Sequence, residues 1–458
     1  MEKQTLILEK MITSLLSEKK YPSLRDILVT MNPSDIAGVF NELEQDRIPL
    51  LFRLLPKELA AETFVEMEPE AQELLIRGFS DSELKEVVDE LYLDDAVDLV
   101  EEMPANVVRR ILAQADPDTR KSINELLRYP ENSAGSIMTT EYVTLRPAMT
   151  VGESILRIRR TGVDKETIYT CYVTNNRTLM GLVTVKDLLL AEDDDTPIRE
   201  IMETHVISVN TQTDQEEVAR MFAKYNFLAM PVVDAENRMV GIVTFDDAMD
   251  VMEEEATEDI EIMGGMSPSE KTYSRATVWD LFKQRIPWLL LLMVSATFTG
   301  MIITSFETAL AAQVALTAFI PMLMDTGGNS GSQSSVTIIR ALSLGELEFG
   351  DLPRVVWKEI RTAVCCGAVL AVVCFGKIML VDKLLMGNDS ITAGVALVVC
   401  LTLCVTVFVA KAVGCTLPMV AKKLGFDPAV MASPFITTIV DALSLLVYFG
   451  IAKALLGL

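Results

Sequence analysis

The sequence predicts a multi-domain membrane protein, with an acidic α-helical N domain, two tandem α/β domains, a connecting acidic helix and a transmembrane domain of five helices. Residues 1–280 hold 55 acidic and 28 basic residues, whereas residues 281–458 hold 10 and 12, so an acidic half precedes an apolar half. A motif is duplicated in the acidic half, and five long apolar runs fill the other. The predicted domain boundaries are 1–135, 136–200, 201–256, 257–280 and 281–458.

The N domain is expected to be a stack of short helices. Four segments share an acid, apolar residues at helical spacing and a terminating proline or turn: 35–43, 58–69, 83–91 and 95–104. Asp94 and Asp98 are four residues apart and therefore share a helix face. Like charges at this spacing repel each other, so the pair is either a solvated acidic face or part of a cation site.

The duplicated motif predicts two copies of one α/β domain. Residues 181–184, GLVT, recur as GIVT at 241–244, and Asp187 recurs as Asp247. Helices are expected at 150–161 and 214–225, strands at 168–174 and 229–233, and extended segments at 143–144 and 207–208. This order and ending resemble a pair of CBS domains, which often bind adenine nucleotides. The resemblance implies a sensor with ATP as a candidate ligand; the alternative is a dimerisation module without a ligand.

An acidic helix is expected to follow the second α/β copy. Residues 245–261 read FDDAMDVMEEEATEDIE and contain no Lys or Arg. Crowded carboxylates repel one another, and oxygen ligands alone favour hard cations such as Mg²⁺ and Ca²⁺. No EF-hand pattern is present, and His205 is the only histidine in the sequence. The alternative is a solvated acidic linker.

Five apolar runs predict transmembrane spans at 286–306, 309–339, 355–381, 391–418 and 429–456. Lysine and arginine concentrate on one side of these runs, as at Lys283, Arg340 and Lys422. Because basic loops stay in the cytoplasm, the N-terminal half is expected to be cytoplasmic and the C-terminus outside. The chain is therefore expected to be a multi-pass protein of the plasma (inner) membrane.

Two features of these runs indicate an ion path. Asp441 is the only carboxylate within the fifth run, and an acid at that depth must face protein or water. The second run contains GGNSGSQ at 327–333, a polar stretch that lipid does not tolerate. The alternatives are a buried aspartate that only holds helices together, glycines that only allow close packing, and a proton-coupled carrier.

With these motifs in place, the whole chain resembles the MgtE family of magnesium channels. The motifs are GGNSGSQ at 327–333, GFDPA at 425–429, and Pro434 followed by TIVD at 438–441. The resemblance implies a homodimer in a lipid bilayer, with a pore in which Asp441, Asn329 and Thr438 meet hydrated Mg²⁺. It also implies regulatory Mg²⁺ ligands at Asp94, Asp98, Asp214, Glu216, Asp246, Asp247, Asp250, Glu255, Glu258 and Asp259.

Three residues depart from the pattern expected of the family. Asn226 replaces an expected aspartate in the sensor, and Ser433 stands where asparagine would fit. Lys411 lies near the cytoplasmic end of the fourth run, where asparagine is expected. If Lys411 pointed into the pore, it would repel Mg²⁺.

The function expected from the sequence is a Mg²⁺-selective channel that imports magnesium and closes when cytosolic Mg²⁺ binds the N and CBS domains. The alternatives are a transporter of Co²⁺ or Mn²⁺ and a membrane-anchored nucleotide sensor. Few soft ligands are available for transition metals, and no phosphate loop or nucleophile–base pair supports an enzyme. Because the acidic half repels phosphate, no nucleic-acid partner is expected.

Overall fold

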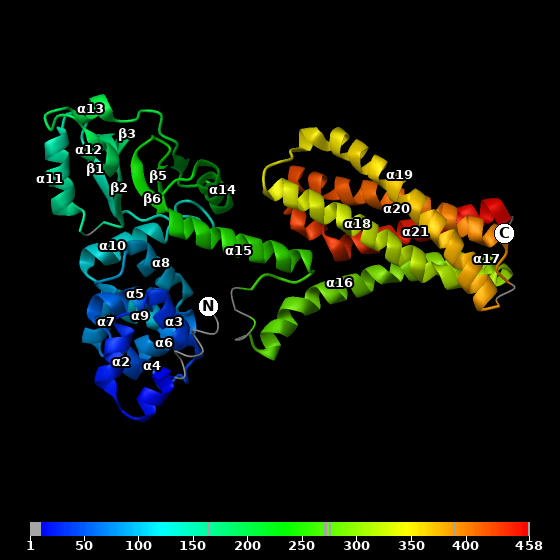
Figure 1. The fold of residues 1–458 in the computed structure, drawn as a ribbon, viewed down its shortest axis with the longest axis horizontal. Coiled ribbons are helices and arrows are strands. Elements are labelled where there is room, and N and C mark those ends of the chain that lie inside the picture. The colour runs from blue at the N-terminus through cyan, green and yellow to red at the C-terminus, as the bar shows by residue number, and fades with distance from the viewer. Residues whose placement is uncertain (1–10, 164, 270–272, 274–275, 388–389, 457–458) are drawn as a thin grey trace. The chain divides into compact units, whose positions relative to one another are not determined.

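The computed structural model describes residues 11–456, apart from 164, 270–272, 274–275 and 388–389. The chain divides into two compact units, Met1–Met252 (unit 1) and Glu253–Leu458 (unit 2). Helix α15 (Phe245–Met263) crosses the boundary between them (Figure 1). Each unit is described by itself below.

Short helices form the first half of unit 1: α2 Tyr21–Leu28, α3 Pro33–Glu42, α4 Ile48–Phe52, α5 Lys57–Val65, α6 Pro69–Gly78, α7 Asp81–Val88, α8 Leu93–Glu102, α9 Ala105–Gln114 and α10 Pro117–Leu126. Proline in the first turn starts several of them, including α3 and α6, because its missing N–H has no partner at a helix start. Ser80 starts α7 with a capping box. The four segments expected to be helical correspond to α3, α5, α7 and α8, and their apolar faces share one buried core.

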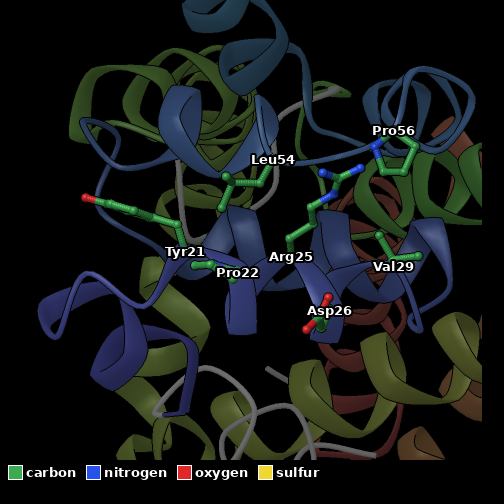
Figure 2. Close-up of a pocket in the computed structure, with 7 residues that line it drawn as sticks. All are labelled: Tyr21, Pro22, Arg25, Asp26, Val29, Leu54 and Pro56. Carbon is green, nitrogen blue, oxygen red and sulfur yellow. The ribbon is translucent and has the colours of Figure 1, made fainter.

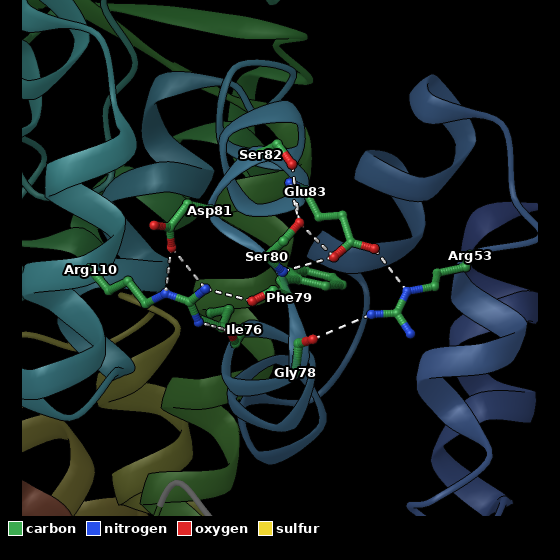
Figure 3. Close-up of polar contacts among 9 residues, drawn as sticks. All are labelled: Arg53, Ile76, Gly78, Phe79, Ser80, Asp81, Ser82, Glu83 and Arg110. Atoms are coloured by element: carbon green, nitrogen blue, oxygen red, sulfur yellow. Dashed lines mark hydrogen bonds and ion pairs between the residues drawn. The ribbon is translucent and has the colours of Figure 1, made fainter.

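Two arginines fasten the junction between α6 and α7 (Figure 3). Arg110 donates to the carbonyl oxygens of Ile76 and Phe79, which are free at the end of α6. Arg53 donates to Gly78 O at 3.3 Å and to Glu83 Oε1 at 2.8 Å. The bonds from Arg53 and Ser80 lower the pKa of Glu83 to about 2. The two arginine side chains thus provide hydrogen-bond donors for the free carbonyl oxygens at the end of α6 and for the Glu83 carboxylate.

The second half of unit 1 contains two similar three-stranded sheets with strand orders β1-β2-β3 and β4-β5-β6. In each, the first pair is parallel and the second antiparallel. The strands are β1 Tyr142–Leu145, β2 Thr167–Asn175, β3 Thr178–Thr184, β4 Val209–Asn210, β5 Ala229–Val233 and β6 Met239–Thr244. The helices are α11 Val151–Thr161, α12 Val185–Leu190, α13 Ile198–Ile201 and α14 Gln215–Tyr225.

The duplicated order expected from the sequence is therefore observed. The extended segment expected at 207–208 lies directly before β4, which begins at Val209 and pairs with β5 at Val232. Alternation of residue types could not locate this strand, because two paired residues are too few to form a pattern.

In the connecting segment predicted at 257–280, α15 ends at Met263. Helix α16 begins at Val278, after a capping box from Thr277. Glu261 joins these parts, because its carboxylate accepts from Ser269 N at 2.9 Å and from Gln284 Nε2 at 2.7 Å. Gly264 and Gly265 follow α15, and Gly265 has a φ of 71° that a continuing helix cannot accommodate, so the predicted segment combines the end of a helix with a linker.

Unit 2 is built from long helices. They are α16 Val278–Ser305, α17 Glu307–Ala312, η1 Val314–Phe319, α18 Ile320–Ser343, η2 Phe349–Asp351, α19 Leu352–Lys377, η3 Ile378–Leu385, α20 Ala393–Lys423, η4 Pro428–Met431 and α21 Ser433–Leu456. Four helical stretches in the described residues are long and apolar enough to cross a membrane: Val278–Ser305, Phe349–Leu385, Ala393–Lys423 and Pro428–Leu456.

The run predicted at 309–339 was wrong as a single span. It is divided among α17, η1 and α18, because Gln313 leaves the helical conformation and Pro321 starts a new helix. The polar stretch at 327–333 does not interrupt α18. Its glycines instead let α18 pack closely against α20 and α21 (Figure 1), since a Cβ at Gly414 would overlap the carbonyl oxygen of Gly331.

Candidate functional site

Asp441 lies on α21 and has a second carboxylate, Asp325, as its charged neighbour. Its Oδ1 is buried and has no hydrogen-bond partner in the described part of the chain. Asp325 of α18 is close enough to interact with it electrostatically. Asn329, one turn along α18, donates from Nδ2 to Asp325 Oδ1 at 3.1 Å. The structure therefore brings the predicted residues Asn329 and Asp441 to one place through Asp325.

Asp325 was not among the predicted site residues. It lies in the same polar stretch as Asn329 and is four residues before it, so the two share a helix face. That spacing was the available signal. The proximity of Asp441 depends instead on how α18 and α21 pack.

The third predicted pore residue, Thr438, is three residues before Asp441 and so lies on the same side of α21. Its hydroxyl donates to Pro434 O at 3.1 Å, within its own helix. The hydroxyl oxygen keeps a lone pair for a hydrated ion. The prediction for Thr438 stays a prediction.

Buried hydroxyls surround the glycines of α18. The side chains of Thr402, Thr406 and Ser444 are almost fully buried, and their hydroxyls have no hydrogen-bond partner among the described residues. A Cβ at Gly327 would meet Thr406 Cγ2 at 2.7 Å and Ser444 Oγ at 2.9 Å. Polar groups without partners are unfavourable in an apolar bundle, so these hydroxyls are unusual features of the helix contacts around Gly327.

The positive charge of Lys411 is compensated by an acidic partner. Its Nζ lies 3.7 Å from Glu359 Oε2 and donates to Ser334 Oγ at 3.2 Å. The lysine is 6% exposed, so this ion pair is inside the bundle. The repulsion of Mg²⁺ considered from the sequence is therefore offset by Glu359.

Acidic side chains from α8 and α15 meet inside unit 1. Burial and the charge of Asp247 raise the pKa of Asp94, which is 7% exposed, well above its usual range. Asp98 lies at the exposed rim, yet the surrounding protein and Asp247 raise its pKa to about 8. Burial raises the pKa of Asp247 to about 6, although hydrogen bonds from Thr244 oppose the shift. The predicted residues Asp94, Asp98 and Asp247 thus lie close together.

Four more acids belong to this group, which we call the acid cluster together with the three above: Asp95, Glu166, Asp246 and Asp250. Burial and Asp247 raise the pKa of Asp95 to about 7, and burial and Asp95 raise that of Glu166 to about 8. The charge of Asp246 also raises the pKa of Asp95, and the charge of Asp250 also raises the pKa of Asp247. Asp95 and Glu166 were missed from the sequence. Glu166 lies just before β2, far in sequence from the other acids of the cluster, so no pattern marked it.

The remaining predicted regulatory residues have other contacts. Asp214 caps α14, accepting from Glu216 N at 2.9 Å, and Glu216 forms an ion pair with Arg220. In unit 2, Asp259 accepts from Ser343 Oγ at 3.2 Å, Glu255 is half-buried and Glu258 is exposed. These contacts do not test a role in binding metal, which stays a prediction.

The members of the acid cluster do not form a compact set of direct metal ligands. Within the described ranges, no three His, Cys, Asp or Glu side chains converge closely enough to hold a metal directly. The charged neighbours that raise the pKa values of Asp94, Asp95 and Asp98 are all acids. Mg²⁺ keeps several of its waters in proteins, so separated carboxylates can hold it through those waters.

Two hollows in unit 1 lie apart from these residues. A groove of about 630 Å³ is lined by Tyr21, Pro22, Arg25, Asp26, Val29, Leu54 and Pro56 (Figure 2). It contains none of the predicted site residues. A cavity of about 500 Å³ beside β2 and α12 is lined by Tyr169, Thr170, Thr184, Val185, Lys186, Leu189, Leu190 and Leu228. The second hollow combines an aromatic ring, an ammonium group and apolar side chains.

Comparison with known protein families covers all of these regions. The family described as a divalent cation transporter, MgtE, matches residues 320–451, and the MgtE intracellular N domain matches residues 31–132. The CBS domain matches residues 134–194 and 198–254. The two copies expected from the duplicated motif are confirmed as CBS domains.

Full-length relatives are similar over nearly the whole chain. The magnesium transporter MgtE of Thermus thermophilus is 39% identical over 98% of this chain and 99% of its own. The magnesium transporter MgtE of Bacillus subtilis is 34% identical over 97% and 96%. Since both relatives are named as transporters, a transporter rather than an enzyme is indicated.

Two solved structures resemble the first half of the chain. One is the cytosolic domain of the Mg²⁺ channel MgtE in complex with ATP, 40% identical, covering 53% of this chain and 99% of that one with a TM-score of 0.51. The other is the soluble part of a magnesium transporter, 29% identical, covering 55% and 99% with a TM-score of 0.51.

Proposed function

This chain belongs to the MgtE family of magnesium transporters, and we propose that it is a Mg²⁺-selective channel that imports magnesium and is closed by cytosolic Mg²⁺. It is a multi-pass membrane protein. The observation that carries the proposal is the approach of Asp441 to Asp325 and Asn329, beside buried glycines of α18. Carboxylate and amide oxygens gathered at membrane depth are typical of a path for a hard cation.

The conduction step follows from the chemistry of Mg²⁺. The ion gives up its water reluctantly, so it would pass the Asp441 level with most of its waters, held by oxygens in the second coordination shell. In a homodimer, two copies of Asp441 would face one ion and neutralise it. Charge and the size of the hydrated ion then select against monovalent ions.

Closure follows from the acid cluster. Without a cation, its carboxylates repel one another or retain protons, as the raised pKa values of Asp95, Asp98 and Glu166 indicate. A divalent cation would replace this repulsion with attraction between α8 and the start of α15. Several weak sites together need only a modest difference in affinity between the open and closed states. The other predicted ligands, Asp214, Glu216, Glu255, Glu258 and Asp259, are proposed to add to this effect.

ATP is proposed as a second ligand of the CBS domains. The cavity of about 500 Å³ has the size of a small-molecule site, with Tyr169 available for stacking and Lys186 for a phosphate. A solved relative contains ATP in its cytosolic domain, which supports the same proposal.

The proposed topology has five spans in the plasma (inner) membrane, with the N-terminus in the cytoplasm and the C-terminus outside. Helix α18 would be the fifth span in addition to the four apolar ones. Its glycines and polar side chains prevent its identification by apolarity, and they would be tolerated because Gly327, Ser330 and Ser334 are buried against other helices.

The direct test is Asp441→Asn, which removes the charge and keeps the shape. We expect Mg²⁺ uptake into proteoliposomes to fall by at least about tenfold, because an uncharged amide no longer attracts a divalent cation. Glu307→Gln, at an exposed carboxylate of α17, is the matched control and should conduct normally. Unchanged uptake in Asp441→Asn would remove the pore role.

A further inference from the structure

Three helices of unit 2 meet at the buried lysine. Lys411 Nζ, on α20, donates to Ser334 Oγ of α18 at 3.2 Å and lies 3.7 Å from Glu359 Oε2 of α19. Ser334 Oγ donates in turn to the same Oε2 at 2.6 Å. One ammonium group therefore contacts two oxygens that are linked to each other.

Close packing of two helices brings these groups together. Helices α18 and α20 touch at Gly331 and Gly414, where neither residue leaves room for a Cβ. Ser334 follows Gly331 by three residues, and Lys411 precedes Gly414 by three. In an antiparallel pair these positions form the next contact, about one turn away. The close packing of the two helix backbones therefore places Lys411 next to Ser334, and the contact does not depend on an extended, flexible side chain.

The charges at this point balance. The side chains of Lys411 and Glu359 are 7% and 15% exposed, so neither charge is solvated by bulk water. Removing one partner of such a pair leaves an unfavourable buried charge. A carboxylate oxygen and a hydroxyl oxygen are also ligands that small inorganic cations use, and the single negative charge of Glu359 matches a single positive charge.

We propose that Glu359 and Ser334 form a pocket for a monovalent cation, and that the Lys411 ammonium fills it as a tethered cation. The lysine closes the pocket to free ions and prevents Glu359 from acting as a second attracting charge beside α18. Without the ammonium, Na⁺ or K⁺ would take its place on the same two oxygens. The proposal concerns other residues than the Mg²⁺ path at Asp441 and does not depend on it.

The test compares thermal unfolding of the full chain in detergent, in NaCl, KCl and choline chloride at equal ionic strength. Choline is too large for a pocket that an ammonium group fills. For Lys411→Met, which keeps most of the apolar stem and vacates the position of Nζ, we expect Na⁺ or K⁺ to raise the Tm by about 3 °C or more relative to choline, because a ligand that binds only the folded state stabilises it. The parent protein and Lys411→Met with Glu359→Gln should show no such difference. Ser334→Ala in the Lys411→Met background should reduce it.

Each other outcome would overturn the proposal. An equal response of Lys411→Met and of its Glu359→Gln double variant would mean that the ions act elsewhere. If Lys411→Met unfolds in every salt while the double variant folds, the buried carboxylate is unfavourable but cannot recruit a free cation. If the double variant also fails to fold, Lys411 acts through packing rather than through its charge.

Discussion

Asp94 in the acid cluster of unit 1 and the carboxylate Glu359 of unit 2 are both largely shielded from bulk water, but their neighbours differ. Asp94, Asp95 and Asp98 have acids as the charged neighbours that shift their pKa values. Glu359 has Lys411 and the hydroxyl of Ser334. A buried carboxylate needs a positive partner or a proton. In unit 2 the chain itself supplies the positive partner, whereas in unit 1 we propose that a cation from solution takes this place. Under this proposal the Glu359 pair is permanent, and the acid cluster responds to the Mg²⁺ concentration.

The largest effect is expected from Asp94→Asn combined with Asp247→Asn. These changes remove two charges from the acid cluster, so Mg²⁺ has less to bridge. We expect the channel to remain open at Mg²⁺ concentrations that close the parent, with the closing concentration raised by about tenfold or more. Mg²⁺ uptake into proteoliposomes with Mg²⁺ on the unit 1 side would measure it.

The duplicated domain offers a matched control for this variant. Asp187 accepts from Thr184 Oγ1 at 2.6 Å, just as Asp247 accepts from Thr244 Oγ1 at 2.5 Å. Asp187→Asn therefore removes the same capping carboxylate outside the acid cluster, and it should close like the parent. If Asp187→Asn and the double variant shift closure equally, the effect comes from helix capping and the contrast between the units is lost.

A smaller effect is expected from pH. In the folded state, burial raises the pKa of Asp95 to about 7 and those of Asp98 and Glu166 to about 8. The unfolded chain releases these protons near pH 4, so the folded state binds more protons between about pH 4 and pH 8. Without divalent cations, the stability of this region should therefore fall as the pH rises through that window. Amide hydrogen exchange in α8 should be faster at pH 8 than at pH 5.5, after correction for intrinsic rates.

Adding Mg²⁺ at pH 8 provides a second test of the same carboxylates. At pH 8 the ion would replace the missing protons, and exchange in α8 should slow again. Exchange near Glu359 in α19 should respond to neither change, because Lys411 already compensates that carboxylate. An α8 that exchanges equally fast at both pH values would contradict the proposed repulsion among Asp94, Asp95 and Asp98.

The smallest effect is expected from Arg53→Met. Arg53 compensates Glu83 at the surface of unit 1, at 2.8 Å, in contrast to the acid cluster. Exposed ion pairs contribute little, so the loss should be under about 1 kcal/mol in the free energy of unfolding. Arg53 and Ser80 lower the pKa of Glu83 to about 2. Their contribution to the free energy of unfolding is therefore present above about pH 4 and is lost as the pH falls towards 2. Chemical denaturation at pH 7 and pH 3 would measure it.

Local sequence patterns were sufficient to predict many of the helices and strands. The helix expected at 214–225 is α14, Gln215–Tyr225, and the strand expected at 229–233 is β5. Both lie in a repeat with capping residues and turns that mark their ends. The single span expected at 309–339 was wrong, because hydropathy alone does not register the break at Gln313.

The sites could be predicted less completely from the sequence, because the residues that form them come from distant parts of the chain. Asn329 and Asp441 were predicted, but the link through Asp325 depends on how α18 and α21 pack. Lys411 was recognised as unusual, yet its partner Glu359 lies on another helix and 52 residues away. Side-chain spacing identifies neighbours within one helix and cannot identify those between helices.

The contrast between the two units is tested most directly by amide hydrogen exchange of the full chain as Mg²⁺ is added at pH 8. We predict slower exchange in α8 and in the first turns of α15, at Asp94, Asp98 and Asp247, with no change around Glu359 and Lys411. The Asp94→Asn, Asp247→Asn variant should lose most of that protection, and Asp187→Asn should keep it. Exchange in α8 that is unchanged by Mg²⁺ in the parent would contradict the account.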